Sequence, residues 1–177
     1  MASLFSEEST RDGRAEVCDD SIFAILRGDH REIANLFALL VAETSTAELR
    51  QRTFRRLCVA LISHTRAEEE TFYPRLLGAE ATPALALAFV EDHHLVRKLL
   101  AQILGLSCHD AAWLPKVQIL RVQVEHHVEE EEGKLFSEAR RLLSDDEKRG
   151  VGHAFLKSAR RHAEIAEIML PATDERN

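Results

Sequence analysis

Histidine and glutamate interrupt the apolar face of every long helical stretch in the first three quarters of this chain. Four stretches repeat apolar residues at spacings of three and four, a pattern typical of amphipathic helices that pack against one another. Each series has a histidine where a helical bundle normally has leucine, and two of the series also contain a glutamate. A polar layer inside a bundle must find its partners within the bundle, which restricts the possible folds. The six residues are His30, His64, Glu68, His93, His127 and Glu131.

The spacing of these six residues repeats along the chain. The separation in sequence from His30 to His64 equals the separation from His93 to His127. A glutamate follows one helical turn after His64, and another follows at the same spacing after His127. One constant shift in residue number, which we call the repeat offset, therefore maps the first three of the six residues onto the second three. The repeat offset also aligns the aspartates that precede His30 and His93, and it predicts a duplicated helical hairpin.

Apolar periodicity and capping residues predict five helices. We expect them over residues 21–43, 46–76, from 83 to the connection that starts at 105, 113–143, and from 144 to about 170. Ser45 with Glu48 and Ser144 with Glu147 match the capping-box pattern, and Pro115 suits the first turn of its helix. The short connections favour an all-α, up-down-up-down antiparallel four-helix bundle over residues 19–143. The last helix and tail, residues 144–177, should pack outside the bundle, and residues 1–18 should form a flexible tail.

Composition narrows the class of protein further. The net charge of −7 and the absence of a basic block argue against a nucleic-acid partner. The longest apolar run, residues 84–90, is too short to cross a membrane, and residues 1–20 lack the apolar stretch of a signal peptide. Three widely spaced cysteines without a CxxC motif argue against structural disulfides. We therefore expect a cytoplasmic protein.

The negative charges of two carboxylates in a bundle core must be compensated. An ionised carboxylate without a partner in an apolar interior costs several kcal/mol, and two that face each other raise each other's pKa. The six-residue set contains no lysine or arginine, so a pair of cations is the simplest compensation. Imidazole and carboxylate together suit iron, with manganese or zinc as possible substitutes. We expect the first metal to bind His30 and His64, the second metal to bind His93 and His127, and Glu68 and Glu131 to bridge them.

The number of ligands suggests a function. With an oxo or hydroxo bridge, each of the two iron ions has about five of six ligands, so one position stays open. A small molecule such as O₂, NO or peroxide could bind at that position. A centre without an open position would be structural instead.

The same segments resemble a known family. His30, the segment HTRAEEETFYP from His64, the DHH segment at 92–94 and HVEEEEGKLF from His127 are similar to the hemerythrin-like HHE cation-binding domains over roughly residues 19–143. The resemblance implies an up-down four-helix bundle around a non-haem di-iron centre, with the six residues as ligands. Arg97 stands where oxygen-carrying hemerythrins have a fifth histidine, and Glu131 follows its histidine at the fourth position where they have an aspartate at the fifth. The pattern is closer to the four-His, two-Glu bacterial members, which are linked with NO or oxidative stress, iron handling and iron–sulfur repair.

Three functions fit these observations. The first is a di-iron protein that binds or senses a small molecule or handles iron. The second is an enzyme that consumes peroxide or NO, in which His94, His126 or Tyr73 could deliver protons. The third is a structural or interaction bundle with zinc or no metal, which could form homo-oligomers through its last helix. We expect Tyr73 mainly to pack, and His94 and His126 to lie at the surface or beside the ligands, with the alternative that one of them replaces a neighbouring ligand. The remaining acids of the two motifs, Glu69, Glu70, Glu129, Glu130 and Glu132, are expected to form a solvated face, with the alternative that one of them replaces or supplements a bridging carboxylate.

Overall fold

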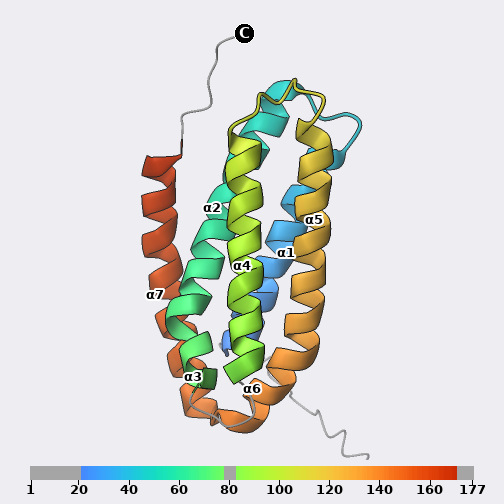
Figure 1. The fold of residues 1–177 in the computed structure, drawn as a ribbon. Coiled ribbons are helices and arrows are strands. Elements are labelled where there is room, and N and C mark those ends of the chain that lie inside the picture. The colour runs from blue at the N-terminus through green and yellow to red at the C-terminus, as the bar shows by residue number, and fades with distance from the viewer. Residues whose placement is uncertain (1–20, 78–82, 171–177) are drawn as a thin grey trace, which may run out of the picture.

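The computed structural model describes residues 21–77 and 83–170, and every regular element in them is a helix (Figure 1). None of the described helices is both long enough and apolar enough to cross a membrane. The elements are α1 (Ile22–Val41), α2 (Ala47–Thr71), α3 (Tyr73–Leu77), α4 (Pro83–Leu104), α5 (Trp113–Glu130), the π-helix η1 (Glu131–Leu135), α6 (Phe136–Leu142) and α7 (Asp145–Met169).

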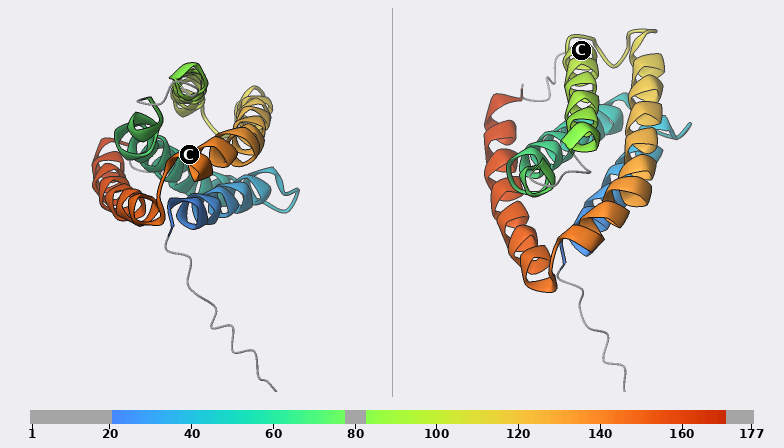
Figure 2. Two further views of the ribbon diagram at one scale, coloured as in Figure 1. Left: turned by 90° about the horizontal axis from the view of Figure 1, so that it is seen from below. Right: turned by 60° about the horizontal axis from the view of Figure 1, so that its bottom comes forward.

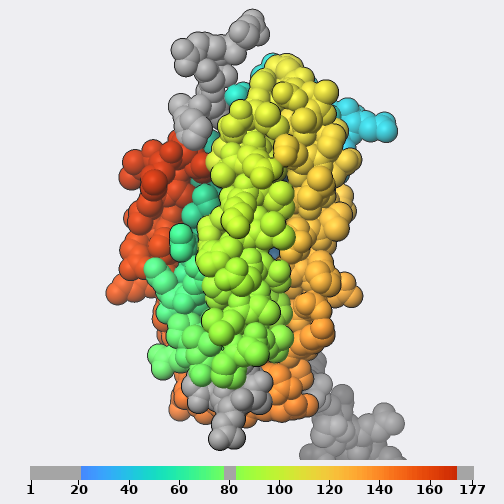
Figure 3. Space-filling view, viewed as in Figure 1, coloured from blue at the N-terminus to red at the C-terminus, as the bar shows by residue number. Residues whose placement is uncertain are grey.

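Four long helices form an antiparallel bundle. Helix α1 packs against α2 and α5, α2 packs against α4, and α4 packs against α5, so the four helices enclose one core. The end-on view in Figure 2 shows this arrangement, and Figure 3 shows the side chains of α4 and α5 meeting along one face. The predicted up-down-up-down four-helix bundle with an additional C-terminal helix is confirmed.

The predicted helix starts are largely confirmed. The capping box at the start of α7 is present, since Ser144 and Glu147 each accept a hydrogen bond from the other residue's backbone N–H. Pro115 lies in the first turn of α5, where its missing N–H costs no helical hydrogen bond. The predicted cap at Ser45 is wrong by one residue: Thr46 is the N-cap of α2, and its hydroxyl accepts from Leu49 N–H at 3.2 Å. The tail expected over residues 1–18 lies outside the described residues, and so does Thr82, which directly precedes the helix expected from residue 83 and would be its N-cap.

Two predicted continuous helices are interrupted. The helix expected over 46–76 is divided at Phe72 into α2 and α3, and Pro74, which has no N–H to donate, lies directly after the interruption. The helix expected over 113–143 contains the π-helix η1, in which the N–H of Phe136 donates to the carbonyl of Glu131, five residues earlier. Both interruptions begin within about one helical turn of a glutamate of the polar layer. The apolar period continues through both breaks, which is why the sequence predicted single helices.

The apolar core has two parts with the polar layer between them. One apolar cluster contains Ile33, Leu61, Val96 and Val124, and the other contains Leu26, Phe72, Phe89 and Leu135. Each bundle helix, taken together with the interruption that follows α2 or α5, contributes one of these residues to each cluster, and its histidine lies between them in sequence. The six polar residues are therefore enclosed on both sides by apolar packing that excludes water.

Helix α7 lies outside the bundle, along α2 and α1 (Figure 1). Its C-terminal end is held by Arg55, which donates hydrogen bonds to the backbone carbonyls of Leu170 at 3.0 Å and Glu167 at 2.7 Å. These are carbonyls at the end of a helix, which have no partner within it. Phe155 of α7 is fully buried, and its ring lies edge-on to the ring of His64, with 5.8 Å between centroids. The fifth helix therefore forms part of the wall around the polar layer.

Candidate metal centre

The structure brings the six predicted residues together in the middle of the bundle. His30 comes from α1, His64 and Glu68 from α2, His93 from α4, His127 from the end of α5 and Glu131 from the start of η1. All six are buried, and no more than 5% of any of them is exposed. Because the four helices are antiparallel and in register at this height, residues from the first helix and from η1 meet in one layer.

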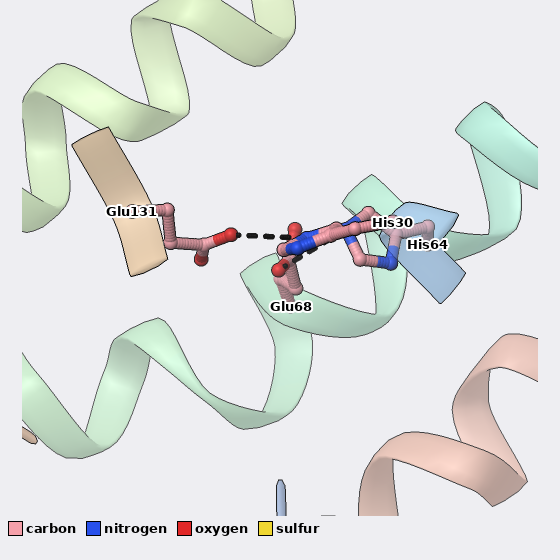
Figure 4. Close-up of side chains that lie close together, drawn as sticks. All are labelled: His30, His64, Glu68 and Glu131. Carbon is pink, nitrogen blue, oxygen red and sulfur yellow. Dashed lines mark hydrogen bonds and ion pairs between the residues drawn. The ribbon is translucent and has the colours of Figure 1, made fainter. Parts of the chain in front are cut away.

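His30, His64, Glu68 and Glu131 form a first donor group (Figure 4). The Nε2 atoms of His30 and His64 are 3.2 Å apart, and Glu68 Oε1 lies 3.3 Å from His64 Nε2. Glu131 extends from η1 across the core and places Oε2 3.4 Å from His30 Nε2. One donor atom from each of the four residues lies within 4.8 Å of the others.

Glu68, His93 and His127 form a second donor group. Glu68 Oε2 lies 3.3 Å from His93 Nε2, and the Nε2 atoms of His93 and His127 are 3.2 Å apart. Glu68 therefore takes part in both groups, with a different oxygen in each. Glu131 is less evenly placed, because its Oε2 lies 4.0 Å from His127 Nε2 but 3.4 Å from His30 Nε2.

The donor groups fit metal ions in both spacing and chemistry. Imidazole nitrogens and carboxylate oxygens bind first-row metals at about 2.0–2.2 Å, so neighbouring ligands on one ion lie about 3 Å apart. The distances of 3.2–3.4 Å within the groups are close to that value. Glu68 Oε1 and Glu131 Oε2 are also buried and accept no hydrogen bond from the described residues. Burying a carboxylate oxygen without a hydrogen bond lowers the free energy of unfolding. A cation bound at this oxygen would remove that penalty.

A carboxylate lies next to the outer ring nitrogen of each histidine. Nδ1 of His30 donates to Glu132 at 2.8 Å, Nδ1 of His64 to Asp29 at 3.2 Å, and Nδ1 of His93 to Glu69 at 3.1 Å, while Nδ1 of His127 lies 3.7 Å from Asp92. A carboxylate at Nδ1 holds a proton on that nitrogen and directs Nε2 inward, so that Nε2 can bind a metal ion once it has lost its own proton. The prediction that Glu69 and Glu132 are part of a solvated face is wrong, because both are directed at histidines.

These outer carboxylates extend the internal repeat. The repeat offset relates Glu69 to Glu132, just as it relates the aspartates before His30 and His93. The partners cross between the halves, since the glutamate of the second half holds His30 and the glutamate of the first half holds His93. Each half of the repeat therefore depends on the other to orient one of its histidines.

Two arginines hold the outer glutamates. Arg97 Nη1 donates to Glu69 at 2.7 Å, and Arg27 Nε donates to Glu132 at 3.1 Å. Burial by itself raises the pKa of Glu69, but hydrogen bonds from His93 and Arg97 outweigh it and lower the pKa to about 2. Arg97 therefore keeps the Glu69 carboxylate charged, and through Glu69 it helps to hold His93.

Protons take the place of cations in the metal-free cluster. Burial by itself lowers the pKa of His64, but Glu68 and Asp29 outweigh it and raise the pKa to about 10. Burial likewise raises the pKa of Glu68, and the imidazoles of His64 and His93 reverse that effect and hold it well below its usual range. A metal ion must therefore displace a proton from this site.

The other histidines among the described residues lie away from both donor groups. His94 and His126 are exposed neighbours of His93 and His127, and they pair with Glu91 and Glu130 on their own helices. His162 pairs with Glu70 at 2.8 Å on the outside of α2 and does not border the cluster. The expected positions of His94 and His126, at the surface or beside the ligands, agree with the structure, and neither residue belongs to a donor group.

Tyr73 does more than fill space beside the polar layer. It was expected mainly to pack, with proton delivery as its role in the enzyme hypothesis, and its hydroxyl lies 3.1 Å from Glu131 Oε1 and 3.3 Å from His93 Nε2. Burial and the charges of Glu131 and Glu68 raise the pKa of this phenol well above its ordinary value. One sequence signal was available: the repeat offset aligns Tyr73 with Phe136, directly after each interrupted helix.

The fold and the donor groups define a four-helix bundle with a buried His/Glu cluster that is suited to metal. Residues 21–139 match the family model of the hemerythrin HHE cation binding domain, and the chain belongs to this family. The structure of an HHE cation binding domain-containing protein from Mycobacterium kansasii has the same fold, with a TM-score of 0.72 and 22% identity over 85% of this chain and 91% of that chain. A DNA nickase from Nostoc sp. is 30% identical over 132 residues, which are 73% of this chain and 36% of the nickase. This chain therefore spans about a third of that relative's length.

Proposed function

We propose that this protein holds two iron ions and uses them to bind or sense a small molecule such as O₂, NO or peroxide, or to handle iron. The observation that carries the proposal is that Glu68 presents one carboxylate oxygen to each of two donor groups, 3.3 Å from His64 Nε2 and 3.3 Å from His93 Nε2. A carboxylate in this position would be able to hold two cations at once. Manganese or zinc could replace iron in the same donors.

The protein's own residues set the properties of the centre. Carboxylates at Nδ1 direct Nε2 of His30, His64 and His93 inward, and the two apolar clusters exclude bulk water. The first donor group supplies four protein ligands and the second supplies three, fewer than the six that iron accepts. Bound iron would supply redox chemistry and open positions for a small molecule.

Metal analysis with neighbouring histidine variants tests this proposal. Protein that is loaded with iron under anaerobic conditions and then exposed to air should contain about two iron ions per chain. It should also show an oxo-to-iron charge-transfer band. His93→Ala and His127→Ala should lower the iron content, whereas the controls His94→Ala and His126→Ala should leave it unchanged. Equal losses in all four variants, or no bound metal in the parent protein, would refute the proposal.

The second candidate is an enzyme that consumes peroxide or NO. The position of Tyr73 favours it, because the phenol oxygen lies 3.3 Å from His93 Nε2 and therefore next to the place where a reacting molecule would bind. His94 and His126 do not support the candidate, since both are exposed and paired elsewhere. Turnover assays with peroxide and NO decide between the two candidates: rates no better than those of free iron would leave binding or sensing.

The other expectations remain proposals. We propose no nucleic-acid ligand, because the chain has a net charge of −7 and corresponds to only about a third of the Nostoc nickase.

Self-association through α7 is supported by Ile168 and Met169, which are exposed near the end of that helix. Sedimentation of the parent protein and of Ile168→Glu would test it. A cytoplasmic location also remains a proposal.

A further inference from the structure

Tyr73 has a polar function that packing does not explain. Its ring is buried and stacks on His93, with 5.5 Å between centroids and 25° between planes. The hydroxyl is directed into the polar layer, 3.3 Å from His93 Nε2, 3.1 Å from Glu131 Oε1 and 3.5 Å from Glu68 Oε2. A phenylalanine would fill the same space without placing a polar atom in the core.

The internal repeat provides that comparison within one chain. The repeat offset makes Phe136 the counterpart of Tyr73. The ring of Phe136 stacks on His30 with 6.4 Å between centroids and 18° between planes. Both rings thus cover an equivalent histidine, one in each half. Only the ring beside the second donor group carries a hydroxyl.

The two donor groups also differ in the number of protein ligands. The first group has four, and the second has only Glu68, His93 and His127. The Tyr73 oxygen lies at 3.3 Å from His93 Nε2 and 3.5 Å from Glu68 Oε2, similar to the spacing of 3.2–3.3 Å within the second group. These distances are close to the separation of about 3 Å expected between neighbouring ligands on one ion. The hydroxyl is therefore placed as a fourth donor for the group that has three.

We infer that Tyr73 is a metal ligand, whose phenolate oxygen binds the cation held by Glu68, His93 and His127. The inference rests on the proposed metal centre. On binding, the O–H bond breaks, the proton leaves to solvent and the oxygen keeps the electron pair that it donates to the cation. The added negative charge favours a trivalent over a divalent ion at this position. The two metal positions are consequently inequivalent in charge and in donor set.

The chain contains a single tyrosine, so any tyrosinate signal reports on this residue. The experiment titrates zinc into metal-free full-length protein near neutral pH and records the ultraviolet difference spectrum and the protons released. Zinc is redox-silent and has no visible bands of its own, and a phenol is protonated near neutral pH, so the starting protein contains no tyrosinate. A tyrosinate band should appear with metal and saturate at one tyrosinate per chain. Tyr73→Phe should lack the band, release about one proton fewer and still hold two metals at saturating zinc, with weaker binding of one.

Ferric protein provides a second measurement. The parent protein should show a visible phenolate-to-iron charge-transfer band that Tyr73→Phe lacks, while both keep the oxo-to-iron bands. Thermal melting of the metal-free proteins controls for loss of fold in the variant.

The outcomes separate this inference from the proposed function. Two metals per chain with no tyrosinate band, and equal proton release in both proteins, would overturn the inference and leave the proposed function intact. Failure of the parent protein to bind metal would overturn both. A saturating tyrosinate signal that is absent from Tyr73→Phe supports both.

Discussion

Glu132 accepts a hydrogen bond at 2.8 Å from Nδ1 of His30, although the two residues lie near opposite ends of the bundle sequence. The contact joins η1 to α1 and crosses between the two halves of the repeat. His93 has the equivalent contact with Glu69. The orientation of the inward nitrogens is thus a property of the assembled bundle.

The first prediction concerns this contact. Glu132→Ala should lower metal affinity about 10- to 100-fold, because partners of a ligand's second nitrogen typically have effects of that size. Competition with a chelating dye measures the affinity. Glu129→Ala is the matched control, since Glu129 is an exposed residue on α5 close in sequence, and its replacement should change nothing. Equal affinities in the parent protein and in Glu132→Ala would contradict the assigned role of Glu132.

Metal should stabilise the fold through the bridging carboxylate. At a free metal concentration 100 times Kd, one bound ion adds about 2.7 kcal/mol to the free energy of unfolding. A chelator should therefore lower the melting temperature of the parent protein. Glu68→Leu removes the bridge and should make the melt nearly insensitive to the chelator. A parent melt that does not respond to chelation would instead favour a purely structural bundle.

The metal-free protein should lose stability at alkaline pH. The pKa of His64 is about 10 in the folded state, compared with 6.5 for an unperturbed histidine. Its contribution to the free energy of unfolding is therefore complete below about pH 6.5 and is lost as the pH rises through 10. The pKa of Glu68 is lowered from 4.5, so its contribution is present above that value and is lost as the pH falls through the folded pKa. Denaturant unfolding in a chelator should show greatest stability between about pH 5 and 6.5.

Metal affinity should follow the opposite trend over the same range. Imidazole must be deprotonated to bind metal, so affinity should rise as the pH increases from about 6.5. The control is His94→Ala, which should leave both pH profiles unchanged because His94 is exposed. Metal-free protein that became more stable between pH 6.5 and 10 would contradict the pairing of His64 with Glu68.

Cys58 should be unreactive in the folded protein. It is fully buried in the apolar core, and burial raises the pKa of its thiol to about 12, so almost no thiolate forms near neutral pH. A Cys18→Ser/Cys108→Ser variant isolates this thiol. It should resist a thiol reagent until denaturant is added, and then react with one equivalent. Fast labelling of the native variant would show that the core around α2 opens readily.

The helical bundle could be predicted from the sequence because the apolar periodicity of a helix depends only on residues close together in the chain. Spacings of three and four place Leu57, Leu61, His64 and Glu68 on one face of α2 whatever surrounds that helix. The interruptions at Phe72 and η1 were missed because the apolar period runs through them. Pro74 was a local sign of the first interruption, whereas the second, η1, begins at a glutamate that also fits a regular α-helix.

By itself the sequence determined which six polar residues share the buried layer, because the repeated spacing and the helical pitch are properties of the chain alone. Only the tertiary structure decided what surrounds them. Glu69 and Glu132 follow the ligands directly and were read as solvated, yet each reaches a histidine of the other half. Tyr73 and Phe136 are equivalent in the repeat, yet only one places oxygen beside the donors. Such contacts join helices far apart in sequence, so their geometry exists only once the four helices pack.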